Sequence, residues 1–294
     1  MTRGTSRVAV KRWQFVGAIR EDAVFGAAVA DISYSATAFA YVYLCDEKKL
    51  IEFGALDPLG RNARLSASSV EGETVFKKSG ARFSFENGAG VVRIGGAGGL
   101  SADLHFEREG HAPLCGVYRN GLRGFHYTHK AAGFPVHGTV RVDGRVLDFS
   151  PDTCLGVFDW SAGCPARRTH WNWASGAGRA VGGETIGINL AAGINETGMT
   201  ENVFWIGGRP EKVDTVRFDY DPKAREQPWT MASADGKVEL EFHPEGERAE
   251  STNLILLASE FHQFLGRYRG RLRAGTTTRD VEFYGFAEEH DALW

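Results

Sequence analysis

The segment from residue 158 to residue 202 concentrates the side chains of this chain that could do chemistry. It combines tryptophans with acidic, basic and amide groups: Trp160, Trp171, Trp173, Asp159, Glu201, Arg167, Arg168, His170 and Asn172. Indole rings give a ligand a large apolar contact area, and a few polar groups among them orient the ligand or react with it. The segment therefore predicts a pocket for a small, largely apolar organic molecule.

The acids Asp159 and Glu201 are the candidate proton donors. A carboxyl group among tryptophans is costly to ionise, which keeps its proton available for general acid catalysis at neutral pH. The alternative interpretation is structural: Asp159 caps a turn, and Glu201 forms an ion pair with Arg167 or Arg168. Residue types and spacing leave both interpretations open.

The stretch HWNWAS has the composition of a β-strand, whose side chains point alternately to its two faces. Trp171 and Trp173 then share one face, and Arg168, His170 and Asn172 share the other. If the tryptophan face lines the pocket, the indoles form its wall. If the opposite face lines it, His170 is the base or an orienting group and the tryptophans pack elsewhere. The sequence favours neither arrangement.

Histidine spacing does not predict a metal site. His126 and His129 lie three residues apart, which puts them on opposite faces of an extended strand, and His137 lies further downstream. No HExxH pattern or cysteine–histidine pair supports a metal centre, and we expect none. Lys130, directly before AAGFP, is interpreted as a solvated turn residue rather than an anchor for an anion.

The elements that must position these residues are predicted to be β-strands. Short apolar runs are separated by tight-turn pairs at residues 87–88, 143–144 and 235–236, which are typical of hairpins. Residues 238–242 alternate apolar and acidic side chains, which predicts a sheet with one dry face and one wet face. Only residues 151–160 suggest a helix, and a short one.

Short strands at hairpin spacing predict an all-β fold of antiparallel barrels or a sandwich. The chain divides into two meanders of similar size, and we place a soft boundary near residue 128. The predicted domains are residues 1–128 and 129–294, and the second domain carries the candidate site.

Bulk composition argues against several classes of protein. The 294 residues are 43% hydrophobic and 24% charged, which is typical of a globular chain, and a net charge of −3 argues against a nucleic-acid surface. No apolar run approaches the roughly 18 residues that insertion into a membrane requires, and no signal-peptide pattern is visible. We expect a cytoplasmic protein, and its oligomeric state is not predicted.

Other common motifs are missing. The four cysteines lack CxxC spacing, which predicts free thiols, with a Cys154–Cys164 bridge as the less favoured alternative. The glycine cluster at residues 95–99 matches neither GxGxxG before a helix nor a P-loop, and GxSxG is absent. These observations argue against P-loop enzymes, nucleotide-binding dehydrogenases and serine hydrolases.

Several longer motifs resemble one protein family. They are KRW at residues 11–13, KAAGFPVHGTVRVDGR at 130–145, DW at 159–160, HWNWAS at 170–175, TEN at 200–202 and the terminal GFAEEHDALW. Together, over nearly the whole chain, they are similar to the bacterial domain-of-unknown-function family 2804. That family is distantly similar to the lipocalin-like carotenoid 1,2-hydratases and Diels–Alderases.

The resemblance implies two tandem lipocalin-like antiparallel β-barrels, or strongly curved sheets, with few short helices and an apolar pocket in or between them. It also implies chemistry without a redox cofactor: hydration, isomerisation or cyclisation. Carotenoid hydratases protonate an alkene with acidic and aromatic residues, but their catalytic positions do not transfer residue by residue to this chain.

The sequence thus predicts a cofactor-independent enzyme that uses proton transfer on a small apolar molecule. Asp159 or Glu201 would be the acid and His170 the base, and the substrate would be bound by Trp160, Arg168, Trp171, Asn172 and Trp173. One alternative is a lipocalin-like protein that binds an apolar ligand without changing it. Another is a glycan-binding or glycan-active protein.

Overall fold

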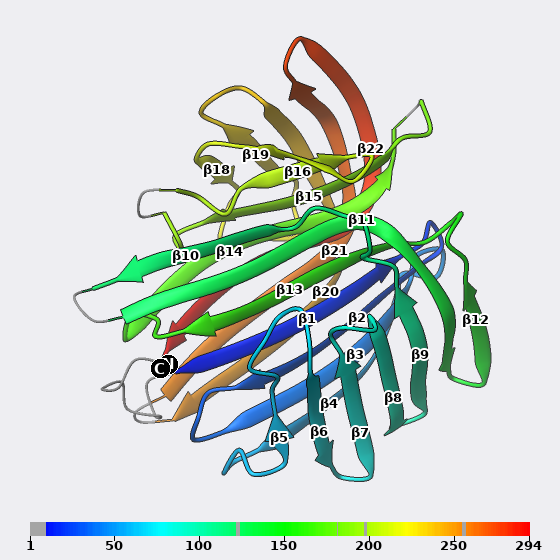
Figure 1. The fold of residues 1–294 in the computed structure, drawn as a ribbon, viewed down its shortest axis with the longest axis vertical. Helices are drawn as coiled ribbons and strands as arrows, with labels where there is room; N and C mark the ends of the chain where they lie inside the picture. Colours follow the sequence, from blue (N-terminus) through cyan, green and yellow to red (C-terminus); the bar gives the residue numbers. More distant parts are fainter. Residues whose placement is uncertain (1–9, 122–123, 181, 197–198, 255–256) are drawn as a thin grey trace.

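The computed structural model describes residues 10–121, 124–180, 182–196, 199–254 and 257–294. The regular elements in these ranges are β-strands, arranged in two antiparallel sheets (Figure 1). The first sheet forms a nearly closed barrel and the second a half-barrel. This confirms the predicted all-β fold. Within the same residues, no helix has the length and apolar character needed to cross a membrane.

The first sheet contains thirteen strands: β1 (Lys11–Ile19), β2 (Ala23–Asp31), β3 (Ala36–Leu44), β4 (Lys49–Asp57), β5 (Ala63–Arg64), β6 (Glu73–Lys78), β7 (Ala81–Glu86), β8 (Val91–Ala97), β9 (Leu100–Phe106), β10 (Leu114–Asn120), β11 (Gly124–Val142), β12 (Arg145–Phe149) and β13 (Leu155–Gly163). Their order is β4-β3-β2-β1-β13-β11-β9-β8-β7-β6-β5, and β10 and β12 also pair with β11. The long strand β11 therefore connects the two halves of this sheet.

The second sheet contains nine strands: β14 (Arg168–Arg179), β15 (Thr185–Ala192), β16 (Val203–Ile206), β17 (Arg209–Lys212), β18 (Val216–Asp219), β19 (Trp229–Ser233), β20 (Val238–Leu254), β21 (Leu257–Ala274) and β22 (Thr277–Leu293). Their order is β17-β16-β15-β14-β22-β21-β20-β19-β18. The sheets change between β13 and β14, whereas residue 128, the soft boundary expected from the sequence, lies inside β11.

The two sheets pack through a shared apolar layer. Strands β1 to β3 are buried almost throughout, so their alternate side chains enter two different layers. Phe25 belongs to the core of the first sheet, whereas Val24 belongs to a layer that also contains Trp173 and Phe286 of the second sheet. Continuous apolar strands are expected where a sheet is covered on both faces.

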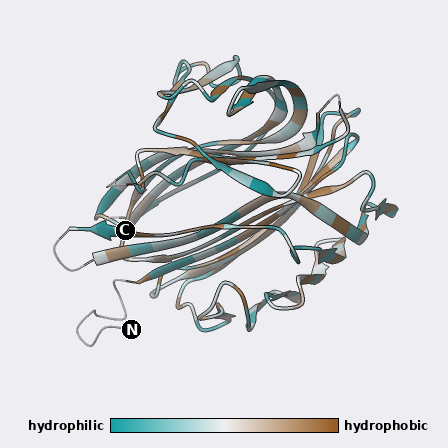
Figure 2. Ribbon diagram, turned by 45° about the horizontal axis from the view of Figure 1, so that its top comes forward, coloured by the Kyte–Doolittle hydropathy of each residue, from teal (hydrophilic) through white to brown (hydrophobic). Residues whose placement is uncertain are grey.

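The predicted hairpins are confirmed. Turns at residues 87–88, 143–144 and 235–236 lie between strands that pair directly: β7 with β8, β11 with β12, and β19 with β20. Along residues 238–242 the apolar side chains are buried and the glutamates are exposed. Brown and teal segments accordingly follow one another along the strands in Figure 2.

The helix predicted for residues 151–160 is wrong. Most of this stretch belongs to β13, which pairs with β1 on one side and β11 on the other. Its apolar side chains are buried on both faces: Val157 enters the layer between the sheets, and Phe158 and Trp160 enter the core of the first sheet. Successive side chains of a strand point to opposite faces, so a run whose successive side chains are all apolar suits a central strand that is covered on both faces.

The four cysteines are free thiols, so the Cys154–Cys164 bridge does not form. Burial raises the pKa of Cys154 to about 12. A thiol that stays protonated is a poor nucleophile, and Cys154 is therefore no candidate for covalent chemistry.

The backbones of the two sheets come into contact where β11 crosses β15. A Cβ atom on Gly187 would lie 2.1 Å from the backbone oxygen of Ala132. Gly133, at the same crossing, has a φ of +92°, in the region that glycine adopts most readily. Because Gly133 and Gly187 have no side chains, the two sheets can approach each other closely at a point three residues from Lys130 along β11.

Gly187→Ala should lower the free energy of unfolding by about 1–3 kcal/mol, because the added methyl group overlaps a backbone oxygen with little room to move. Urea denaturation followed by tryptophan fluorescence measures this change. Gly54→Ala is the matched control, since no atom lies within 4 Å of the added carbon, and it should change stability by less than about 0.5 kcal/mol. Equal losses in the two variants would contradict the close contact.

Candidate functional site

A cavity of about 220 Å³ lies between the two sheets. A single water occupies roughly 10–15 Å³ on this scale, so the cavity has room for an organic molecule. Its walls come from β1, β2, β3, β4, β11 and β13 of the first sheet and from β14, β20, β21 and β22 of the second. Both sheets are therefore needed to enclose it.

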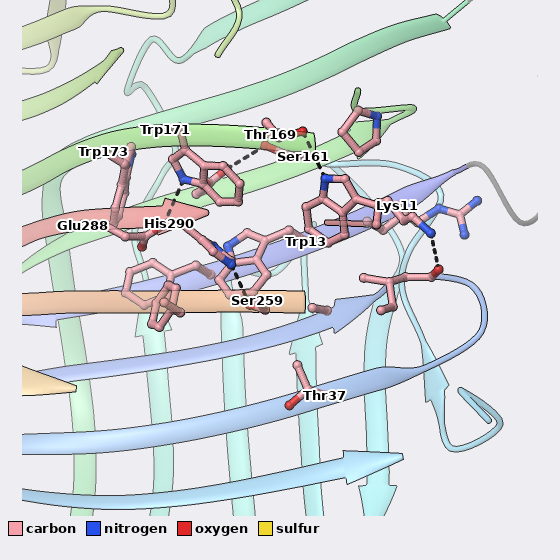
Figure 3. A pocket seen from close by; sticks show the side chains of 18 of the residues that line it. Lys11, Trp13, Thr37, Ser161, Thr169, Trp171, Trp173, Ser259, Glu288 and His290 are labelled. Atoms are coloured by element: carbon pink, nitrogen blue, oxygen red, sulfur yellow. Dashed lines mark hydrogen bonds between the residues drawn. The ribbon is translucent and has the colours of Figure 1, made fainter. Parts of the chain in front are cut away.

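The tryptophan face of β14 lines this cavity. Trp171 and Trp173 both border it, and Figure 3 shows them beside Glu288. Trp173 belongs to the apolar layer between the sheets, and its indole nitrogen donates a hydrogen bond of 2.9 Å to Asn189 Oδ1. Trp171 is only partly buried and packs against the same layer. The two indoles form part of the cavity wall.

The opposite face of β14 lies outside the cavity. His170 and Arg168 are exposed, and Arg168 Nη2 pairs with Asp291 Oδ2 at 2.8 Å. Asn172 is buried, but its amide donates a hydrogen bond of 3.0 Å to the hydroxyl of Tyr220. The structure therefore does not bring these three predicted site residues to the cavity. Because the bulky indoles occupy the space between the sheets, strand alternation turns the polar side chains away from it.

Trp160 also points away from the cavity. It belongs to the core of the first sheet, where its ring packs edge-on against Tyr127 with the centroids 5.6 Å apart. Its chain neighbours Asp159 and Ser161 occupy the other face of β13 and border the cavity. In the DW pair, Asp159 therefore borders the cavity and Trp160 packs in the core of the first sheet.

Lys130 forms a buried ion pair with Asp159 at the cavity wall. The distance from Lys130 Nζ to Asp159 Oδ2 is 2.6 Å, and Glu201 Oε2 lies 4.0 Å from the same ammonium. Lys130 is 4% exposed, Asp159 7% and Glu201 3%. The prediction that Lys130 is a solvated turn residue is wrong, because β11 continues through this position and pairs it directly with Asp159 on β13.

The charges of this cluster are mutually stabilised. Burial opposes the charge on Lys130, but the carboxylates of Asp159 and Glu201 outweigh burial and raise the pKa of Lys130. Asp159 also accepts a hydrogen bond of 3.0 Å from Ser161 Oγ, and Glu201 accepts one of 3.1 Å from Asn195 Nδ2. The cluster therefore contains one ammonium and two carboxyl groups, each with a donor or counter-ion.

Glu288, on β22, has a different environment. Its burial raises the pKa of this carboxyl group to about 7, although hydrogen bonds from Trp171 and Gln263 act in the opposite direction. Trp171 Nε1 donates to Oε1 at 3.0 Å, and Gln263 Nε2 donates to Oε2 at 3.2 Å. Both oxygens already accept hydrogen bonds, so a proton on Glu288 is available to a third partner in the cavity.

A buried tyrosine fixes the amide that holds Glu288. Tyr41 Oη, on β3 of the first sheet, donates a hydrogen bond of 2.5 Å to Gln263 Oε1. This bond assigns the oxygen end of the amide to Tyr41 and leaves its nitrogen to donate to Glu288. Tyr41 and Gln263 are both 0% exposed. The orientation of Glu288 therefore depends on contacts from both sheets.

A neutral histidine continues the aromatic wall. Burial lowers the pKa of His290 to about 3, and its Nε2 lies 2.8 Å from Ser259 Oγ (Figure 3). The imidazole centroid lies 4.2 Å from that of Trp171, and Trp294 stacks on Trp171 at 6.4 Å. His290 therefore contributes an uncharged aromatic ring rather than a charge at neutral pH.

Arg248 supplies a second buried cation beside the cavity. Its guanidinium carbon lies 3.9 Å from the ring centre of Phe39 and 5.5 Å from that of Phe261. The guanidinium also forms ion pairs with Glu52 at 3.0 Å and Glu250 at 2.9 Å. These contacts hold two aromatic rings of the cavity wall in place.

His126 and His129 point to opposite faces of β11, as their spacing predicted. His126 borders the cavity, and its Nδ1 lies 2.8 Å from Asn195 Oδ1. His129 Nδ1 lies 2.9 Å from Ser69 Oγ, within the first sheet. The pair therefore cannot bind one metal ion together.

Sequence reasoning missed several residues that the structure brings to the cavity or to its supporting contacts: Lys130, Glu288, His290, Gln263, Tyr41 and Arg248. One signal was available, because Glu288 and His290 lie in the terminal GFAEEHDALW motif and alternation places them on one face. No local signal relates Tyr41 to Gln263, which are 222 residues apart in the chain.

Glu288→Gln should change how stability depends on pH. Because the pKa of Glu288 is raised from 4.5 to about 7, the folded chain holds this proton more tightly than the unfolded chain. The contribution of Glu288 is fully present below about pH 4.5 and is lost as the pH rises to about 7, by an amount on the order of 3 kcal/mol. Urea denaturation across this range measures it.

Buried histidines change the pH dependence of stability in the opposite direction. Because burial lowers the pKa of His290 from 6.5 to about 3, the folded protein loses stability as the pH falls through this range. The informative quantity is therefore the stability of the parent minus that of Glu288→Gln, which should fall between pH 4.5 and 7. Exposed Glu109→Gln is the control and should give a flat difference. A flat difference for Glu288→Gln as well would contradict the raised pKa.

Comparison with known proteins places the chain in a family. Kievitone hydratase from Nectria haematococca shares 13% sequence identity and a TM-score of 0.53, over 95% of this chain and 88% of the hydratase. CghA with Sch210972 shares 13% identity and a TM-score of 0.60, over 98% of this chain and 89% of CghA. These likenesses show the fold alone.

No curated protein matches the sequence. The family model described as Domain of unknown function (DUF2804) matches residues 2–294, and the chain therefore belongs to the DUF2804 family.

Proposed function

We propose that this protein is a cofactor-independent enzyme that uses proton transfer on a small, largely apolar organic molecule. The observation that carries the proposal is Glu288, which borders an aromatic cavity and whose burial raises the pKa of its carboxyl group to about 7. An acid that titrates near the working pH can donate a proton and later recover one. Hydration, isomerisation and cyclisation are the reactions that this property suits.

Protonation of a carbon–carbon double bond is the proposed first step. The π electrons of the alkene form a new bond to the proton of Glu288, which leaves a carboxylate on the protein and a cation on the second carbon. If water attacks the cation, the excess proton returns to Glu288 and the product is an alcohol. If the cation instead loses a neighbouring proton to Glu288, the double bond has moved. Attack by a second double bond of the same molecule, followed by loss of a proton to Glu288, closes a ring.

The surroundings of Glu288 support such a cation. The faces of Trp171 and Trp173 attract positive charge. Asp159 and Glu201 contribute negative charge at the same cavity, and Lys130 holds both in place. Groups that are fixed before the reaction stabilise developing charge without reorganising.

The proposal moves the acid from Asp159 or Glu201 to Glu288. Asp159 is the counter-ion of the Lys130 ammonium, whose Nζ lies 2.6 Å from Asp159 Oδ2. Glu288 accepts its hydrogen bonds from neutral donors, an indole and an amide. One structurally similar protein is named kievitone hydratase, and this name supports hydration as a reaction to test first.

A second candidate function is binding of an apolar ligand without chemistry. It is favoured by the fact that the polar groups at the cavity already have partners in the protein, as in the pairs Lys130–Asp159 and Trp171–Glu288. A lipocalin-like fold can serve either function, so the fold does not separate them.

Deuterium incorporation separates the two functions. The protein is incubated in D₂O with a panel of apolar alkenes and enones, and mass spectrometry measures solvent deuterium and water added to each compound. Tryptophan quenching measures binding separately. Glu288→Gln should reduce incorporation by at least about a hundredfold, because the amide has no acidic proton, while ligand affinity stays within about threefold.

His170→Ala is the control, since this exposed side chain lies on the outer face of β14, and it should retain full activity. Incorporation by Glu288→Gln at the parent rate would show that another group donates the proton. Tight binding without any incorporation by the parent protein would favour the binding function instead.

A further inference from the structure

Two histidines meet on the face of the first sheet that points away from its core. His105 on β9 and His137 on β11 are direct partners in antiparallel register. Their ring centroids lie 4.8 Å apart. The adjacent residues Phe106 and Val136 belong to the core of the first sheet, so alternation directs the two imidazoles to its other side.

A carboxylate completes this cluster. Glu107 follows His105 by two residues, which places it next along the same face, and its Oε1 lies 2.7 Å from His137 Nδ1. One ligand atom from each of the three residues lies within 4.8 Å of the others. None of the three borders the cavity between the sheets. The cluster is therefore a separate feature of the molecule.

Two imidazole nitrogens and one carboxylate oxygen form a donor set that suits Zn²⁺ and related dications and leaves coordination positions open for water. Zinc bonds of about 2.0–2.2 Å require ligand atoms roughly 3.3 Å apart. Side-chain rotation covers the difference from 4.8 Å, since paired strands already hold the backbones as neighbours.

We propose that His105, Glu107 and His137 bind one Zn²⁺ ion on the outer face of the first sheet. The ion would replace the hydrogen bond between His137 Nδ1 and Glu107 Oε1, and these two atoms would move apart from 2.7 Å to roughly 3.3 Å to bind it. The side chains of His137 and Glu107 are 45% and 40% exposed, so the ion enters directly from solvent. Binding adds a cross-link between the paired strands β9 and β11. Lys130 lies on β11 as well. This site does not depend on the function proposed for the cavity.

Isothermal titration of the tag-free, chelator-treated chain with ZnCl₂ tests the proposal. The parent should bind one equivalent, and His105→Ala and His137→Ala should each weaken binding by at least about tenfold, since each removes a metal ligand. His243→Ala is the matched control. His243 also pairs with a glutamate, Glu241, but it belongs to no cluster of three ligand groups among the residues that the structure describes. Its removal should leave Zn²⁺ affinity unchanged.

Thermal denaturation with and without ZnCl₂ provides a second readout, because an ion that binds only the folded chain raises its melting temperature. This increase should occur in the parent and in His243→Ala and disappear in His137→Ala. His137→Gln, which retains a polar side chain, replaces the alanine variant if that variant fails to fold. Undetectable binding at 100 µM Zn²⁺, or equal affinity in all variants, would overturn the site and leave only a hydrogen bond between His137 and Glu107.

Discussion

The pairing of Lys130 with Asp159 is the interaction on which the interior of this protein depends. An ammonium enclosed between two apolar sheets is costly unless an anion lies within hydrogen-bond reach. The register of β11 and β13 supplies that anion as a direct cross-strand neighbour, and Glu201 adds a second carboxyl group at 4.0 Å. Because Asp159 serves as the counter-ion, the function we propose assigns the proton donor to another carboxyl group.

That group is Glu288, which differs from Asp159 in its neighbours rather than in its chemistry. Its hydrogen-bond donors, Trp171 and Gln263, are neutral, and burial raises its pKa to about 7 although both hydrogen bonds act in the opposite direction. Two carboxyl groups of one cavity thus have contrasting environments, which is how proteins assign different tasks to the same chemical group. The contacts that orient Glu288 begin with Tyr41 on the other sheet. The packing of the sheets and the acidity of the site are consequently linked.

The candidate site was partly predictable because aromatic and acidic residues cluster in one segment of the chain. Four of the predicted residues border the cavity: Asp159, Glu201, Trp171 and Trp173. Four others from the same segment point elsewhere: Trp160, Arg168, His170 and Asn172. Composition identifies a segment with suitable groups, but alternation sends about half of them to the other face of each strand. The cavity groups on β3, β11, β21 and β22 lie outside residues 158–202 in the sequence. They contact that segment only once the two sheets have packed together.

By itself, the sequence determined the all-β fold, because short alternating runs separated by tight turns form hairpins and not long helices. The family was identified separately, from the resemblance of several longer motifs. It did not identify β13, since a short run that is apolar on both faces has no periodicity to separate a strand from a buried helix. Only the tertiary structure decided which face of β14 is enclosed and which distant groups form ion pairs or hydrogen bonds with one another. Alternation sorts side chains onto two faces without specifying which face is inward, and that choice depends on what the opposite sheet places against each face.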